Sequence, residues 1–126
     1  MIPTKTRGWP RWLFRAAISA ETLLVFTQAG LAGGFLAGHY GFLDLHKANA
    51  TYTGVTTLVV VVCAVLLWRP GGGPAWPIFV SAGLFAAEAG QIVLGYGRVL
   101  AVHIPLGVAI TASIVVLAIW AWRDVE

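Results

Sequence analysis

Apolar residues occur along this chain in four long blocks that short polar stretches separate. Two of the blocks, residues 48–68 and 104–122, contain no charged residue over 21 and 19 positions. The other two, residues 16–40 and 76–97, are each interrupted by a single acidic residue. Because about 20 apolar residues in a helix cross the hydrocarbon core of a bilayer, each block is long enough to span a membrane.

The pattern predicts an all-α fold, a single membrane four-helix bundle over residues 1–126. The predicted spans are residues 13–37, 46–68, 77–97 and 101–122. Composition agrees, since 59% of the residues are hydrophobic and 10% are charged, against roughly 25% charged in soluble domains. The first span is longer than the apolar core of a signal peptide and carries an acid, so we expect it to be retained. The lipid bilayer is therefore the first expected partner.

Basic residues are distributed unequally between the two sides of the predicted bundle. Lys47 and Arg98 fall on one side, whereas six others fall on the opposite side: Lys5, Arg7, Arg11, Arg15, Arg69 and Arg123. All six tryptophans fall at the helix ends on that second side. The positive-inside rule then predicts a multi-pass protein of the cell membrane with both termini in the cytoplasm. Since topology explains the net charge of +3, we expect no nucleic-acid partner.

Two histidines open the second and fourth predicted spans, His46 and His103. Both spans run in the same direction, so the histidines lie at the same depth, and a three-residue error in a boundary shifts the match by less than about 5 Å. Two neutral imidazoles that face each other in a bundle can bind haem iron, one on each face. Ala50 and Gly107 follow one turn later and leave room beside each ring. The alternative is a pair of ordinary interfacial histidines, and His39 is read as a solvated loop residue.

Several glycines and two cations are further candidates for contact with a haem bound by His46 and His103. Gly30, Gly34 and Gly38 recur at every fourth position, and Gly34 is a candidate haem-facing position. The alternative is close helix packing through small residues. Lys47 and Arg98 are candidates to bind the acidic groups of a haem, or else they are ordinary loop charges.

Two acids interrupt the first and third blocks, Glu21 and Glu88. A charge at such a position costs at least about 2.5–3.5 kcal/mol, so we expect each acid to be protonated, hydrogen-bonded or turned to the bundle interior. With Gln28 and Gln91 they form a candidate proton path. The alternative is that they hold neighbouring helices together by hydrogen bonds. Because each half contains an acid, a glutamine and a helix-opening histidine, the chain reads as two hairpins, related by duplication or merely alike.

Two segments carry a resemblance to a known family: QAGLAGGFLAGHYGFLDLHKANA (28–50) and QIVLGYGRVLAVHIPLGVAI (91–110). Both resemble haem-bearing hairpins of the haem A synthase family, in which a histidine opens the helix after the turn and a small residue follows it. The resemblance covers the whole chain, as one of the two four-helix halves of such a protein. It implies that a b-type haem is held between His46 and His103.

The chain also departs from the pattern of that family. It has half the length, so two haem centres would require a homodimer or a larger membrane complex. The paired loop cysteines of the family are missing, since Cys63 is the single cysteine. Asp44 stands before His46 where the family carries a glutamate, so oxidation of a haem substrate is not expected and enzymatic activity stays open. We expect Asp44 instead to cap the second helix.

The sequence therefore predicts a haem-binding, cytochrome b-like membrane protein that acts in electron transfer or haem handling. Two alternatives remain. One is a cofactor-free accessory subunit of a larger membrane complex. The other is a small oligomeric proton-coupled transporter that uses Glu21 and Glu88.

Overall fold

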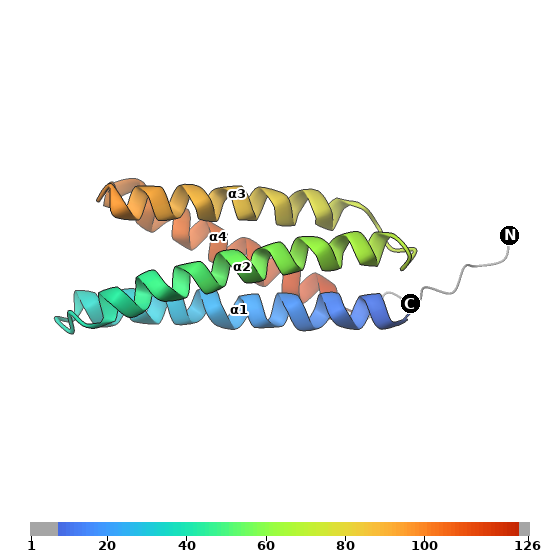
Figure 1. The fold of residues 1–126 in the computed structure, drawn as a ribbon, viewed down its shortest axis with the longest axis horizontal. Helices are drawn as coiled ribbons and strands as arrows, with labels where there is room; N and C mark the ends of the chain where they lie inside the picture. The colour runs from blue at the N-terminus through green and yellow to red at the C-terminus, as the bar shows by residue number, and fades with distance from the viewer. Residues whose placement is uncertain (1–7, 124–126) are drawn as a thin grey trace, which may run out of the picture.

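A computed structural model describes residues 8–123, and this part of the chain consists of four α-helices joined by short turns (Figure 1). The helices are α1 (Gly8–Leu36), α2 (Phe42–Trp68), α3 (Trp76–Tyr96) and α4 (Leu100–Trp122). Each is long and apolar enough to cross a membrane, so the expected all-α architecture of four span-like helices is confirmed. The basic residues Lys5 and Arg7 lie outside the described residues.

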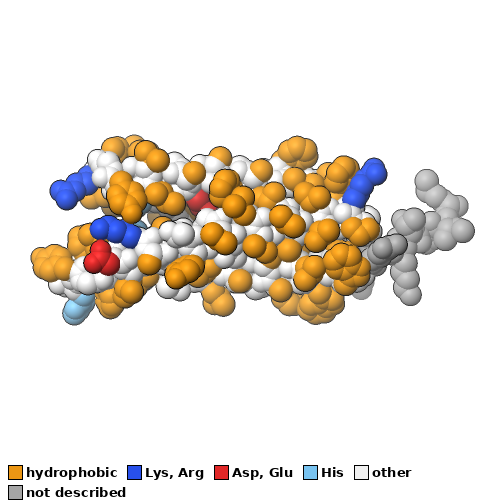
Figure 2. Space-filling model, viewed as in Figure 1, with side chains coloured by type: hydrophobic (Ala, Val, Ile, Leu, Met, Phe, Trp, Pro, Cys, Tyr) orange, Lys and Arg blue, Asp and Glu red, His pale blue; other side chains and the backbone are white. Residues whose placement is uncertain are grey.

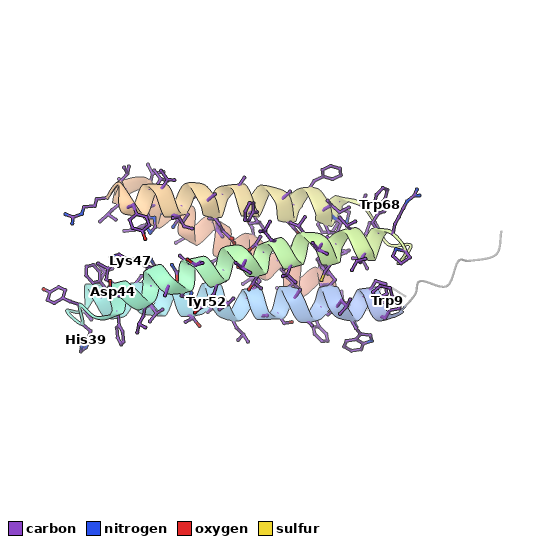
Figure 3. The ribbon with its side chains drawn as sticks, viewed as in Figure 1. Trp9, His39, Asp44, Lys47, Tyr52 and Trp68 are labelled. Carbon is purple, nitrogen blue, oxygen red and sulfur yellow. The ribbon has the colours of Figure 1, made fainter. Side chains whose placement is uncertain are left out.

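The helices form a ring in which α1 and α3 each pack against α2 and α4. Hydrophobic side chains cover the length of the bundle, and the lysines and arginines gather at its two ends (Figure 2). We call one end the tryptophan end, because it holds Trp9 and Trp68, and the other the histidine end, because it holds His39 (Figure 3). An apolar belt between two polar ends is the surface that a bilayer requires.

Two helices begin earlier than the apolar pattern predicts. Helix α1 starts at Gly8, and Pro10 lies buried in its first turn, where a missing backbone N–H costs little. Helix α2 starts at Phe42. The expectation that Asp44 caps α2 is wrong, because Gly41 precedes the helix and no side chain caps it. Asp44 lies inside the first turn, where an acid favours the helix dipole.

The turns at the histidine end repeat one motif. Each of α1 and α3 ends on a residue with a left-handed backbone, Gly38 at φ 97° and Arg98 at φ 56°. The next N–H reaches back five residues, from His39 to Gly34 O and from Val99 to Leu94 O. This pairing satisfies the last carbonyls of a helix. The two hairpins therefore turn in the same way, although only one of them uses glycine.

Residues that face the bundle axis recur at steps of three or four residues, close to the spacing of left-handed helix packing. On α1 and α3 this inward stripe consists of Phe14, Ile18, Glu21, Val25 and Gln28, and of Ser81, Leu84, Glu88, Gln91 and Gly95. On α2 and α4 it consists of His46, Asn49, Thr53, Thr57, Val60 and Ala64, and of His103, Gly107, Ile110, Ile114 and Leu117. Most of the polar members lie toward the histidine end, and the buried apolar core lies mainly toward the tryptophan end.

The tryptophan end is closed by contacts between α1 and α4. The Arg15 guanidinium packs against the rings of Trp12 and Trp122, 5.1 and 5.0 Å from their centroids. Its Nε donates a hydrogen bond to Ala121 O over 2.8 Å, where a cation also complements the C-terminal dipole of α4. Phe14 packs edge-on against Trp120. The two helices are therefore held together at this end.

The spaced glycines of α1 differ in what surrounds them, and this difference can be tested. A Cβ at Gly34 would overlap the ring of Phe42, whereas a Cβ at Gly30 would meet nothing within 4 Å. We expect Gly34→Ala to lower the free energy of unfolding by about 1–3 kcal/mol, as overpacking does. The control Gly30→Ala should leave stability unchanged or raise it by up to about 1 kcal/mol. Unfolding of both variants in detergent, followed by circular dichroism, measures this, and equal stability of the two would contradict the Phe42 contact.

Candidate functional site

A cavity of about 760 Å³ lies in the histidine half of the bundle. Its walls come from all four helices and include His46, His103 and Glu88. Its α1 and α4 walls include Phe26 and Val108, which are exposed on the bundle surface. The cavity therefore opens sideways between α1 and α4, the same two helices that close tightly at the tryptophan end.

His46 projects from α2 toward α1 and is held there by Gln28. Its Nδ1 lies 3.0 Å from the backbone oxygen of Gln28. A carbonyl oxygen only accepts hydrogen bonds, so Nδ1 carries the proton and Nε2 keeps its lone pair. The side-chain amide nitrogen of Gln28 lies 3.2 Å from Nε2, and it donates to that lone pair.

His103 on α4 is held in the same way by Gln91 on α3. Its Nδ1 lies 2.9 Å from the backbone oxygen of Gln91, so its Nε2 also keeps the lone pair. The Gln91 amide nitrogen donates to the backbone oxygen of His103 over 2.7 Å. Gly95 leaves the space beside the ring, because a Cβ there would lie 2.9 Å from Cε1 of His103. In both hairpins, then, the histidine donates to the backbone of the glutamine on the preceding helix.

The two histidines meet across the bundle from the diagonal helices α2 and α4. Their ring centroids lie 6.3 Å apart, with the ring planes at 65°. Since a metal–imidazole nitrogen bond is about 2 Å long and a ring centroid lies about 1 Å behind its nitrogen, two imidazoles on opposite sides of one metal have centroids about 6 Å apart. The observed separation therefore matches the space that one metal ion needs.

Asn49 completes the polar contacts of the first hairpin, and the sequence patterns did not single it out. Its amide donates to Gln28 Oε1 over 2.7 Å and to Leu24 O over 3.0 Å. These bonds fix the Gln28 side chain that contacts His46. The signal was present in the sequence, because Asn49 follows His46 by three residues and so shares its helix face.

Glu21 and Glu88 also face each other across the bundle, from the diagonal helices α1 and α3. They are 1% and 5% exposed, as the expectation of an inward position required. Thr57 on α2 donates to Glu88 Oε1 over 2.9 Å. Glu88 lines the cavity together with Gln91, which lies one turn closer to the histidine end. Glu88 thus lies on the wall of the cavity that the histidines line, and Glu21 faces it from α1.

The remaining candidate positions divide between the cavity and the protein surface. Ala50 and Gly107 line the cavity. Gly34 packs against Phe42, and its neighbour Gly33 lines the cavity in its place. Two candidate cations lie away from it: Lys47 is exposed and pairs with Asp44 over 3.4 Å, and Arg98 occupies the exposed turn after α3.

Comparisons with protein-family models, with curated proteins and with solved structures give no match for this chain. The interpretation of the site therefore rests on its own geometry.

The hydrogen bonds to Gln28 and Gln91 predict the tautomer of both histidines. In protein without added metal at neutral pH, we expect His46 and His103 to carry the proton on Nδ1, because each Nδ1 faces a backbone carbonyl. Solid-state NMR of protein labelled with nitrogen-15 histidine measures this directly. His39, exposed on the connecting turn, serves as the internal control and should exchange between tautomers. A fixed Nε2–H form of either site histidine would contradict the geometry.

Proposed function

We propose that this chain is an integral membrane protein that binds a b-type haem, with His46 and His103 as the two axial ligands. The observation that supports this most strongly is the matched pair of imidazoles. Each Nδ1 donates to a backbone carbonyl, so both Nε2 atoms carry a lone pair; that of His46 accepts a hydrogen bond from the Gln28 amide, and the two ring centroids lie 6.3 Å apart. Histidines that bind metals almost always donate their other ring nitrogen in this way.

The donor set fits haem better than a bare metal ion. Structural zinc has four protein ligands, whereas the described residues 8–123 contain no cluster of three or more His, Cys, Asp or Glu side chains. A porphyrin supplies four nitrogens itself and needs only the two axial ligands that histidines provide. The cavity of about 760 Å³ falls in the range of about 300–1,000 Å³ that is usual for ligand pockets.

The residues of the chain would position and shield this group. Hydrogen bonds to the backbone oxygens of Gln28 and Gln91 orient the two imidazoles. The Gln28 side-chain amide donates to His46 Nε2, so it would have to turn aside for a metal to bind there. The cavity walls are mostly apolar, which would suit the faces of a porphyrin. A bound haem would supply one-electron chemistry between ferric and ferrous iron. Electron transfer or haem handling is the activity that this arrangement supports.

Membrane placement is part of the same proposal. Most of the cations fall at the tryptophan end, so the positive-inside rule places that end and both termini in the cytoplasm. The candidate haem site then lies near the outer face of the cell membrane. The resemblance to one half of a haem A synthase points to the same class of protein, and a homodimer or larger complex would supply a second centre.

A second candidate function is that of a cofactor-free accessory subunit. In that case the two imidazoles would be structural and would hold the α1–α2 and α3–α4 hairpins in register through their bonds to Gln28 and Gln91. The two functions differ in whether the protein binds haem at all.

The visible spectrum of the protein purified in detergent tests the proposal. We expect a sharp Soret band, with α and β bands on reduction, typical of low-spin iron with two histidine ligands. His46→Ala and His103→Ala should each abolish the low-spin spectrum, because each removes an axial ligand. His39→Ala is the matched control and should leave the spectrum intact. A preparation that stays colourless after haem is supplied would overturn the haem proposal and favour the accessory subunit.

Two glycines on α3 allow a finer test of the His103 ligand. A Cβ at Gly95 would push on the His103 ring, whereas a Cβ at Gly90 would meet nothing within 4 Å. We expect Gly95→Ala to displace the imidazole and convert part of the low-spin iron to high-spin, and Gly90→Ala to leave the spin state unchanged. Electron paramagnetic resonance of the ferric protein measures the two populations. Identical spectra for the two variants would show that His103 is not a ligand in this orientation.

A further inference from the structure

The pair of acids, Glu21 and Glu88, has unused hydrogen-bonding capacity in the centre of the bundle. Of their four carboxyl oxygens, one accepts a hydrogen bond, from Thr57 to Glu88 Oε1. Both oxygens of Glu21 and Oε2 of Glu88 are buried and have no partner. The two carboxyls are close enough to interact directly, and a proton on either one would let it donate to the other. Because both carboxyl side chains are deeply buried and have unpaired oxygens, we infer that a proton or a small ion is bound between them.

The groups around the pair do not supply a compensating charge. Thr57 faces it from α2 and does not ionise, and the inward residue of α4 at this level is Ile110. On α2 the titratable side chains nearest Thr57 in sequence are Tyr52 and Cys63, neither of which carries a positive charge, and the histidines His46 on α2 and His103 on α4 lie farther along the bundle. Two carboxylates side by side in an apolar interior repel each other, and the usual resolution is a shared proton.

The pair also has a connection to the candidate haem site. Glu88 lines the cavity, so a proton that enters the cavity can reach it. Gln91 lies one turn farther along α3, and its backbone oxygen and amide contact His103. Its Oε1 is buried without a partner and is free to accept a hydrogen bond from a water or a protonated acid. Glu88, Gln91 and the two histidines therefore line the same cavity.

We propose that Glu21 and Glu88 form a proton-binding site that shares one proton at rest and binds a second when an electron enters the His46–His103 site. The second half of this inference rests on the proposed haem function. If a haem held by His46 and His103 gained one electron from an external donor, the remaining carboxylate would take up one proton from the solvent and so balance the added negative charge. The pair would thus couple electron transfer to proton uptake.

Infrared spectroscopy tests the proton site whether or not haem is bound. At neutral pH we expect a carboxylic acid C=O band that shifts in heavy water. The double variant E21Q/E88Q, which preserves side-chain volume, should lose the band, and the exposed control D44N should retain it. T57V should shift the band without removing it, because it removes the hydrogen bond to Glu88. Absence of the band from the wild-type protein, or its loss on addition of sodium ions, would overturn the proton site.

The pH dependence of the haem midpoint potential tests the coupling. If one proton accompanies each electron, a tenfold change in proton concentration moves the potential by about 59 mV. We expect a slope that approaches this value in the wild type and in D44N, and a much smaller slope in E21Q/E88Q. A pH-independent potential in wild-type protein that shows the infrared band would overturn the coupling alone. Failure to bind haem would overturn the proposed function, while the infrared result would still decide the proton site.

Discussion

Polar groups in the interior of this bundle need partners within the protein, because the four helices are long and apolar enough to cross a membrane and a bilayer core around them would offer no water. The arrangement of the helices follows from this constraint. Gln28, Gln91 and Asn49 turn inward and bind the two histidines or one another, and Thr57 binds Glu88. Hydrogen bonds of this kind cross between neighbouring helices and fix their register, which apolar contacts alone specify poorly.

The bundle divides into two halves with different tasks. Toward the tryptophan end, apolar side chains and the Arg15 contacts with Trp12 and Trp122 hold α1 against α4. Toward the histidine end the same two helices separate and a cavity opens. A tightly packed half can hold a looser half in position, so that paired imidazoles and paired acids keep their geometry without filling the space between them. This division is what makes a binding site compatible with a stable four-helix bundle.

Much of the fold could be predicted from the sequence, but less of the site. The four helices and the inward position of Glu21 and Glu88 follow from hydrophobic pattern and cost of burial. Asp44 shows one limit of prediction from sequence. Its residue type indicated a cap for α2, yet α2 starts earlier, with Phe42 packed against Gly34 in its first turn. Gly34 shows a second limit of prediction from sequence, because its small size leaves room for the ring of Phe42 and not for a ligand in the cavity. In both cases the contact between Gly34 and Phe42 across the α1–α2 turn, which the hydrophobic pattern does not reveal, decided the outcome.

The sequence by itself determined the helices, their order, and the depths in the bundle at which the two histidines and the two acids lie. These features depend on local periodicity and on the free energy of moving side chains out of water. The tertiary structure alone decided that His46 and His103 face each other at 6.3 Å and that each donates to a glutamine backbone. Backbone carbonyls carry no signature in the sequence, and the rotation of one helix against another depends on contacts summed over the whole bundle. The hydrogen bonds that set the tautomer of the two histidines are therefore a property of the fold.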